Sequence, residues 1–374
     1  MFGAFSFIFD QVKRIIFTVT NDLVFDQRMQ RICSTLADVG YSVTLVGRKH
    51  DDSPPLSKNN FEQKRLKCLN KKGKGFYAEF NIRLFLYLLF KKCNCICAID
   101  LDTILPCYYI SKIRKIRRVY DAHEYFSQLD EVVSRPKIYR FWKKLESKML
   151  PLFKNGYTVC ESLAAEFKKQ YGVTYEVIRN MPLYRDINKQ KVNDRVVLYQ
   201  GAVNKGRGLD KLVMAMKDID AVLWVAGNGN FMEEIKRVVE KEKLTGKIIF
   251  WGMLNPTELR SKTAQAYIAI NPFEKKGLNQ YLSLSNKFFD YIHAGIPQVT
   301  MNYPEYKRVN DKYNIAVLID DITPSQISGA INKLFADQNL YDRLSDNCKI
   351  ASKELNWENE KPKLLNFYSQ LFNE

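Results

Sequence analysis

Residues 279–300, NQYLSLSNKFFDYIHAGIPQVT, join a polar loop to a short helical pattern and then, after Gly-Ile-Pro, to a β-like run. Small hydroxyl and amide side chains precede the helical pattern. A helix N-terminus carries unpaired N–H groups and a partial positive charge, so it is a ready anion site. Lys287 and Asp290 lie one turn apart on this helix and are expected to share a face. We predict that this stretch binds phosphate and sugar hydroxyls at one end of an active site.

Strand and helix patterns alternate around this stretch in two series. In the first series the strands are expected at residues 14–20, 41–46, 63–69, 95–99, 118–121, 156–159 and 175–178. In the second series they are expected at residues 196–199, 221–226, 247–251, 267–270, 298–300 and 315–318. Alternation of this kind predicts parallel α/β sheets.

The two series define the expected domains. We predict a Rossmann-like domain over residues 1–185 and a second one over residues 186–355, with a polar linker at residues 182–194. Residues 356–374 are expected to form a helix that crosses back to the first domain. The fold class is therefore α/β, with two Rossmann-like domains that face each other across a cleft.

Positive charge is concentrated in the first half of the chain. The net charge of the 374 residues is +17, of which residues 1–185 carry +14. Such a basic surface favours an anionic partner: a membrane surface, a lipid phosphate or nucleic acid. The alternative is that the charge only keeps the protein soluble.

No segment reaches the roughly 20 apolar residues that a membrane-spanning helix needs. The apolar start of the chain, residues 1–14, is too short, and residues 76–90 include Glu79 and Arg83. Apolar residues recur with helical spacing from Phe76 to Leu88. This helix is expected either to pack on its own sheet or to lie near a membrane-bound acceptor.

The eight cysteines do not form a C-x-x-C pair. Cys93, Cys95 and Cys97 alternate, which predicts one face of a strand carrying buried, reduced thiols. With only three histidines, neither a metal nor another cofactor is expected. The absence of a signal-peptide pattern predicts a cytoplasmic protein, and the basic charge favours a peripheral position on the inner face of the cell membrane.

Glycine-rich turns follow several strands of the second series. Residues 201–208, GAVNKGRG, resemble a phosphate-binding loop, and Lys205 and Arg207 are suited to neutralise an anion. The Lys-Ser/Thr pair of a P-loop is absent, which excludes an ATPase of that type. Gly227 and Gly252 also follow strands, so the three turns are expected to form a ligand rim, although each alone is consistent with a tight connection.

Acidic residues and one histidine follow strands of the first series. Residues 100–102 (DLD) and 121–124 (DAHE) both lie where ligands bind in open α/β sheets, beyond the carboxyl ends of the strands. His123 is expected to face the second domain across the cleft. A structural role for this histidine is the alternative.

Taken together, these motifs resemble the retaining glycosyltransferases of family four, which have the GT-B fold, and most of all bacterial cell-surface polysaccharide enzymes. The resemblance covers nearly the whole chain. The motifs that carry it are residues 26–31 (DQRMQR), 121–124 (DAHE), 201–208 (GAVNKGRG), 227–229 (GNG), 285–290 (SNKFFD) and 294–297 (AGIP).

The resemblance implies the roles of the candidate site residues. Arg207 and Lys287 would hold the donor diphosphate, Asp290 would bind the ribose, and His123 would contact the donor sugar near its reacting carbon. Met253 follows a strand where family members wrap the base. The resulting candidate site has catalytic positions His123, Arg207 and Lys287, and donor-binding positions Gly201, Lys205, Gly227, Met253, Ser283, Leu284, Ser285, Asn286 and Asp290.

One position departs from the family pattern. The first acid of its E-x(7)-E motif is replaced by Leu282, and Asp290 is one methylene shorter than the second. Asn279, Gln280 and Ser283 are candidates to orient the transferred sugar instead.

The implied reaction is transfer of a hexosyl or related sugar from a UDP-sugar or GDP-sugar to a glycan or lipid-linked acceptor. Retention would come from front-face attack, with the cations and the helix N-terminus stabilising the leaving diphosphate without a metal. A GT-B-like nucleotide-sugar epimerase is an alternative. A nucleic-acid-binding protein is a weaker one, since neither basic residues interleaved with aromatics nor a known binding module is present.

Overall fold

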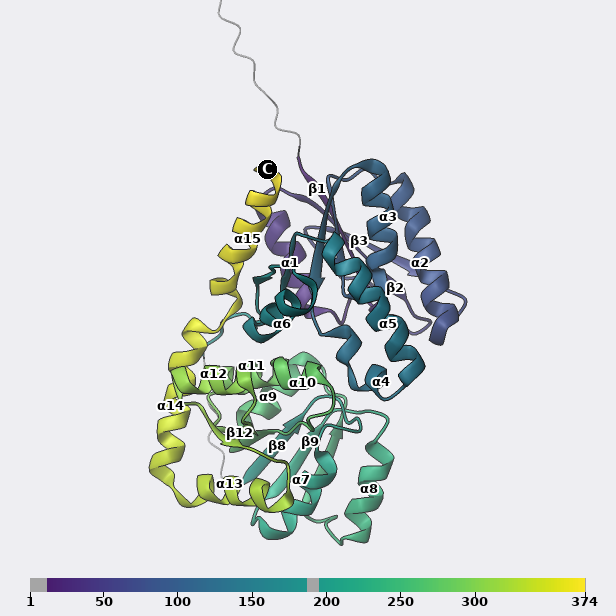
Figure 1. Cartoon of the computed structure of the whole chain (residues 1–374). Helices are drawn as coiled ribbons and strands as arrows, with labels where there is room; N and C mark the ends of the chain where they lie inside the picture. Colours follow the sequence, from purple (N-terminus) through teal and green to yellow (C-terminus); the bar gives the residue numbers. More distant parts are fainter. Residues whose placement is uncertain (1–11, 187–194, 374) are drawn as a thin grey trace, which may run out of the picture.

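The computed structural model describes residues 12–186 and 195–373 as two α/β domains, one above the other in Figure 1. The apolar start of the chain lies largely outside the described residues, and so does most of the expected linker.

A seven-stranded parallel sheet, in the order β3-β2-β1-β4-β5-β6-β7, forms the centre of the first domain. Its strands are β1 (Arg14–Thr18), β2 (Ser42–Lys49), β3 (Glu62–Lys67), β4 (Cys95–Ile99), β5 (Arg117–Ala122), β6 (Gly156–Thr158) and β7 (Glu176–Val177). The central strand β4 is buried at every position, as expected for a strand covered on both faces.

Helices cover both faces of this sheet. They are α1 (Gln27–Asp38), α2 (Gly73–Phe90), α3 (Ile104–Arg114), α4 (Asp130–Val133), α5 (Pro136–Met149), α6 (Glu161–Tyr171) and the last helix, α15 (Trp357–Asn373), with short 3-10 turns at Leu101–Thr103, Phe126–Gln128 and Leu150–Leu152. Apolar residues of α2, α3, α5 and α6 form the core on one face. Those of α1 and α15 form the core on the other face.

The second domain has a six-stranded parallel sheet in the order β10-β9-β8-β11-β12-β13. Its strands are β8 (Val196–Gln200), β9 (Val222–Ala226), β10 (Ile248–Gly252), β11 (Ile268–Asn271), β12 (Gln298–Met301) and β13 (Ala316–Ile319). Its helices are α7 (Leu209–Ala215), α8 (Met232–Lys241), α9 (Pro256–Gln265), α10 (Leu278–Leu282), α11 (Asn286–His293), α12 (Pro304–Tyr313), α13 (Pro324–Ala336) and α14 (Gln338–Glu354), with a 3-10 turn at Met216–Asp218.

The predicted fold class, two parallel α/β domains, is confirmed. The first part of the opening stretch was expected to be a loop, but it forms the short helix α10. Helix α11 and strand β12 follow in the predicted order.

Helix α15 returns the chain from the second domain to the first (Figure 1). The Trp357 amide donates to the carbonyl of Pro182 at 2.8 Å, and its indole N–H donates to Thr35 on α1 at 3.0 Å. Tyr368 is fully buried against Phe17 and Tyr157. The helix is therefore part of the core of the first domain, as the predicted fold requires.

One expectation about the cysteines is wrong. Cys95 and Cys97 share the β4 face that packs against α1 and α15, but Cys93 belongs to the core on the opposite face. Cys93 precedes the first residue of β4, so strand alternation does not fix the direction of its side chain. Seven of the eight cysteines are buried free thiols, and Cys68 is half-buried.

In the part of the chain that the structure describes, helices are too short or too polar to cross a membrane.

Candidate active site

A cleft of about 1140 Å³ lies between the two domains. Residues that follow β1, β4 and β5 line it on one side, and residues from the ends of β8 and β11 and from α9 to α11 line it on the other. Of the twelve predicted site residues, seven line this cleft: His123, Arg207, Ser283, Leu284, Ser285, Asn286 and Asp290.

Arg207 and Lys287 lie against the same aromatic ring. The guanidinium carbon of Arg207 is 5.0 Å from the centre of the Phe273 ring, and Lys287 Nζ is 4.9 Å from it. Lys287 Nζ is also 4.1 Å from the centre of the Tyr199 ring. Both aromatic contacts are favourable for a cation, but neither supplies a negative charge.

Lys287 is buried just behind the cleft lining, with 9% of its surface exposed. Among the described residues its ammonium group has neither a hydrogen bond nor an ion pair. Burial and the nearby charge of Arg207 lower its pKa well below the ordinary value of lysine. An anion bound beside these two cations would offset both effects, because it restores the stabilisation that burial removes.

Backbone N–H groups at the start of α11 add to this positive region. Helix α11 begins after Ser285, whose hydroxyl contacts Asn271 at 3.2 Å and does not cap the helix. In the described structure the N–H groups of Leu284, Asn286 and Lys287 have no acceptor. A helix start of this kind binds anions through its free N–H groups and its dipole.

Asp290 lies one turn further along α11 and faces the cleft. Its carboxylate accepts a hydrogen bond from the Gln200 amide at 2.8 Å, and the oxygen of that amide accepts one from Thr263 at 2.8 Å. Burial raises the pKa of Asp290 to about 6, although Arg31 and Arg260 partly oppose this shift. The second carboxylate oxygen has no hydrogen bond within the described chain, so it is available to a ligand.

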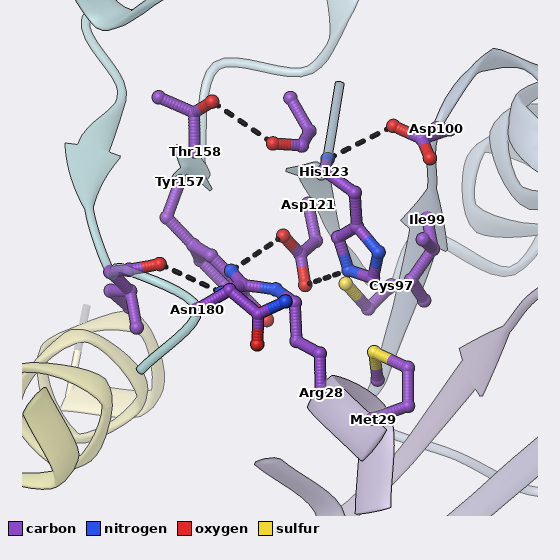
Figure 2. A network of polar contacts seen from close by, with 12 residues as sticks. Arg28, Met29, Cys97, Ile99, Asp100, Asp121, His123, Tyr157, Thr158 and Asn180 are labelled. Atoms are coloured by element: carbon purple, nitrogen blue, oxygen red, sulfur yellow. Dashed lines mark hydrogen bonds and ion pairs between the residues drawn. The ribbon is translucent and has the colours of Figure 1, made fainter. Parts of the chain in front are cut away.

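His123 lies on the opposite side of the cleft in the polar network of Figure 2. Its Nε2 contacts Asp121 Oδ2 at 3.0 Å, and Asp121 Oδ1 accepts a hydrogen bond from Arg28 at 3.0 Å. Burial alone would lower the pKa of His123, but the charge and hydrogen bond of Asp121 raise it to about 9. The contact with Asp121 therefore favours the protonated form of His123, whose second ring nitrogen is unpaired in the described structure.

Two carboxyl groups stand beside this histidine. Asp100 Oδ1 accepts the backbone N–H of His123 at 2.9 Å, and burial raises the pKa of Asp100 well above its usual range. Burial also raises the pKa of Asp102 to about 6, against a hydrogen bond from Thr20. Both residues line the cleft, as does Glu124. The side of the cleft that the first domain forms is therefore rich in oxygen atoms that can form hydrogen bonds.

Four predicted site residues neither line the cleft nor lie buried behind it as Lys287 does. Gly201 follows β8, and Gly227 follows β9. The two glycines lie so close that a Cβ on Gly227 would come within 1.9 Å of the Gly201 carbonyl oxygen. Gly201 has φ of +112°, and a Cβ there would lie 4.0 Å from Lys287 Nζ, so this turn borders the buried ammonium group. Lys205 and Met253 are exposed, and Leu254 lines the cleft beside Met253.

Residues 278–283 form contacts between the domains. Asn279 Oδ1 accepts the backbone N–H of Tyr125 at 2.8 Å, and the Leu282 carbonyl accepts the Cys160 thiol at 3.1 Å. The Leu282 side chain packs against the core of the first domain instead of lining the cleft. Ser283 donates to the Asn279 carbonyl at 2.6 Å. The position of the missing acid is therefore used to hold the two domains together.

Gln280 differs from its neighbours. It lines the cleft with 6% of its surface exposed, and its amide oxygen is buried without a hydrogen-bond partner in the described structure. An unpaired buried acceptor is costly, so a ligand hydroxyl that reached it would be stabilising.

Sequence reasoning did not assign roles to Arg28, Arg31, Gln200 and Arg260. Arg28 and Arg31 lie one turn apart on α1, and both line the cleft. Their spacing on an otherwise apolar helix face was the available signal. The sequence could not show that Gln200 reaches Asp290, because these residues lie on separate elements, β8 and α11.

Comparison with known proteins agrees with this architecture. The family model described as glycosyl transferases group 1 matches residues 180–350, which include Arg207, Lys287 and Asp290. An uncharacterized glycosyltransferase of Methanocaldococcus jannaschii is 23% identical over 188 residues, 48% of this chain and 50% of that protein. The aligned part thus spans about half the length of that curated relative.

Solved structures resemble the whole chain. Sucrose-phosphate synthase from Thermosynechococcus elongatus has a TM-score of 0.80 at 15% identity, covering 96% of this chain and 99% of its own. HepE of Anabaena, solved in complex with UDP and glucose, has a TM-score of 0.73 at 12% identity, covering 95% and 99%. These matches show the GT-B fold of glycosyltransferases. The match to the family model lies within the second domain and the segment of chain that leads to it.

Proposed function

We propose that this protein is a retaining glycosyltransferase that moves a hexosyl or related sugar from a UDP-sugar or GDP-sugar to a glycan or lipid-linked acceptor. The observation that carries the proposal is the placement of Arg207 and Lys287 beside the free N–H groups of α11 at an interdomain cleft. Two cations that form no ion pair within the described residues are suited to a diphosphate. The HepE structure with bound UDP is consistent with a nucleotide in a cleft of this fold.

In this proposal the leaving group, not a nucleophile of the enzyme, receives most of the catalytic assistance. Cleavage of the sugar–phosphate bond develops negative charge on the diphosphate, which Arg207, Lys287 and the α11 start stabilise without a metal. The acceptor attacks from the face that the diphosphate leaves, and a diphosphate oxygen takes its proton. The contacts of α10 hold the two domains together, and closure of the domains over the donor would exclude water and so limit hydrolysis.

The proposal is tested by incubating the purified protein with a panel of UDP-sugars and GDP-sugars and a membrane lipid extract. Release of the nucleoside diphosphate together with a glycosylated product is expected for one donor. Absence of product with every donor and extract would contradict the proposal.

Asp290 is proposed to accept hydrogen bonds from the ribose. Asp290→Asn is expected to weaken binding of the nucleoside diphosphate roughly 10- to 100-fold, because a charged acceptor is lost. Since the pKa of Asp290 is raised to about 6, the carboxylate protonates as the pH falls through 6. Wild-type affinity should therefore fall below pH 6, while the affinity of the variant should not show this component.

Calorimetric titration between pH 5 and 8 measures both effects. Asp342→Asn, at an exposed position of α14, is the matched control. Unchanged affinity in Asp290→Asn would show that this carboxylate does not bind the ribose.

Gln280 is proposed to replace the missing acid and to accept a hydroxyl of the transferred sugar. Asn279 and Ser283 already have partners, and Leu282 faces away from the cleft, which leaves the unpaired Gln280 oxygen. Gln280→Ala is expected to weaken nucleotide-sugar binding about 3- to 10-fold, the value of one neutral hydrogen bond. Affinity for the nucleoside diphosphate alone should not change.

The two affinities are compared by titration, with Gln170→Ala, exposed on α6, as control. An equal loss for the nucleotide sugar and the bare diphosphate would place Gln280 at the nucleotide instead of the sugar.

A nucleotide-sugar epimerase is the second candidate, because Asp100, Asp102 and Glu124 gather on one side of the cleft. An epimerase would convert the donor without any acceptor. Chromatography of donor incubated with protein alone distinguishes the two functions: an epimeric sugar supports the epimerase, and an unchanged donor supports the transferase.

A further inference from the structure

Helix α2 is apolar on both of its faces. Phe76, Phe80, Leu84 and Leu88 are buried in the core of the first domain, as expected for a helix that packs on its own sheet. The opposite face carries Ile82, Leu86, Leu89 and Phe90, which are 61%, 51%, 39% and 81% exposed. Among the described residues, α2 therefore leaves a second row of apolar side chains exposed.

The neighbouring helix α3 extends this stripe. Tyr109 and Ile113, one turn apart on α3, are 51% and 62% exposed. The Arg114 guanidinium donates to the Leu88 carbonyl at 3.2 Å, so the C-terminal ends of α2 and α3 lie together. In Figure 1 the two helices run side by side on the flank of the domain away from α15.

We call this surface the α2–α3 face and define it by Ile82, Leu86, Leu89, Phe90, Tyr109 and Ile113. These are six of the 19 large hydrophobic side chains exposed in the described structure, gathered on two adjacent helices. Exposed apolar side chains scattered singly are ordinary, but six of them on two adjacent helices point to an interaction site.

Basic residues border this face where the two helices end. Lys91 and Lys92 follow α2, and Lys112 and Lys115 lie at the end of α3. Lys91 approaches Glu62 at 3.7 Å, whereas Lys92, Lys112 and Lys115 have no carboxylate partner within the described chain. The border is therefore strongly positive.

Apolar side chains with a positive border distinguish between two possible partners of the α2–α3 face, a second copy of the chain and a lipid bilayer. A second copy of the chain would bring an equally positive border against the first, so its approach would be opposed by charge repulsion. An anionic bilayer accepts both features, because the apolar side chains enter the interface while lysines meet lipid phosphates.

We propose that the α2–α3 face docks this protein on an anionic lipid bilayer. The docking would serve the proposed function by bringing a lipid-linked acceptor to the enzyme. The first turn of α2 supports this, because Phe76 and Tyr77 line a second cavity of about 580 Å³. That cavity shares Thr20, Asn21, Phe25 and Asp26 with the main cleft, so the first turn of α2 lies beside the site, at the opposite end of the helix from Phe90.

The experiment is flotation of the purified protein with phosphatidylcholine vesicles, with and without phosphatidylglycerol. Wild type is expected to float only with the anionic vesicles. Phe90→Ser/Ile113→Ser should lose flotation, and Lys92→Glu/Lys112→Glu/Lys115→Glu should reduce the bound fraction at least about tenfold. All five positions are exposed, so unchanged circular dichroism and melting temperature are expected.

Matched controls lie in the second domain. Ile350→Ser, at a position 59% exposed on α14, and Lys333→Glu, exposed on α13, should float like wild type. Flotation of the α2–α3 variants equal to wild type, or flotation independent of lipid charge, would overturn the proposal. So would a dimer of wild type that Phe90→Ser/Ile113→Ser dissociates.

Failure of docking and failure of the proposed function are distinguishable. Nucleoside diphosphate binding by Phe90→Ser/Ile113→Ser is measured in solution without lipid. If wild type binds the nucleotide but does not float, only the docking proposal falls.

Discussion

Replacing Arg207 or Lys287 by alanine should lower sugar transfer by roughly 100- to 1000-fold, the effect of removing one group that stabilises developing negative charge. Both cations lie within 5.0 Å of the Phe273 ring centre, and neither has an acidic partner at hydrogen-bond distance in the described structure. The loss should fall on the chemical step as well as on donor binding, because the charge on the diphosphate increases as the bond breaks.

Folding should survive these changes. Lys287→Ala removes a buried cation that has no ion pair in the described structure, which should not destabilise the fold. The melting temperature should therefore fall only by the amount that the lost aromatic contacts contribute. Lys211→Ala, an exposed lysine on α7 of the same domain, is the control for loss of one charge. Turnover close to wild type in both Arg207→Ala and Lys287→Ala would refute the assignment of the diphosphate site.

The second large effect concerns stability of the first domain. Arg28→Ala is expected to lower the free energy of unfolding by about 3 to 5 kcal/mol, because it breaks a buried ion pair and leaves the buried Asp121 carboxylate with His123 as its remaining charged partner. Arg28 and Asp121 side chains are 2% and 0% exposed, and their atoms lie 3.0 Å apart (Figure 2). Arg28 also donates to the Ile178 carbonyl at 2.9 Å.

An exposed ion pair provides the contrast. Arg83→Ala removes the pairing with Glu79 on α2, where the Arg83 side chain is 43% exposed, and should cost no more than about 1 kcal/mol. Denaturant unfolding measures both variants. If Arg28→Ala were no less stable than Arg83→Ala, the network beside His123 would not be needed to hold the first domain together.

A double variant separates the charge from the packing. Arg28→Met/Asp121→Asn removes both members of this ion pair, so it should be more stable than Asp121→Asn alone, which leaves the buried Arg28 charge without Asp121. If the losses of unfolding free energy in the two single variants simply add in the double variant, the broken ion pair is not the cause of the destabilisation.

The sequence predicted the fold well because buried parallel strands are short apolar runs between turn residues. Strand β4 was predicted at its observed bounds, and every other strand was predicted within a few residues. Where polar and apolar residues were mixed, prediction was weaker: α10 (residues 278–282, LNQYL) was taken as a loop because of the amides Asn279 and Gln280 and the serines that follow. That polarity reflects its contact with the other domain through Asn279.

Only those parts of the site whose position depends on nearby residues in the sequence could be predicted. The loop with Arg207 follows β8, and α11 lies between β11 and β12, so their positions at one edge of the sheet could be inferred. The pairing of Arg28 with Asp121 joins residues far apart in the chain, and no local periodicity encodes it. Leu282 was read only as a missing acid, because its packing on the other domain depends on how the two domains meet.

The most direct test is a crystal structure of the protein with UDP or GDP, whichever raises its melting temperature. We predict that the diphosphate lies within about 3 Å of the Arg207 guanidinium, the Lys287 ammonium and the N–H groups at the start of α11. A diphosphate bound elsewhere, for example on the basic surface of the first domain, would contradict this account.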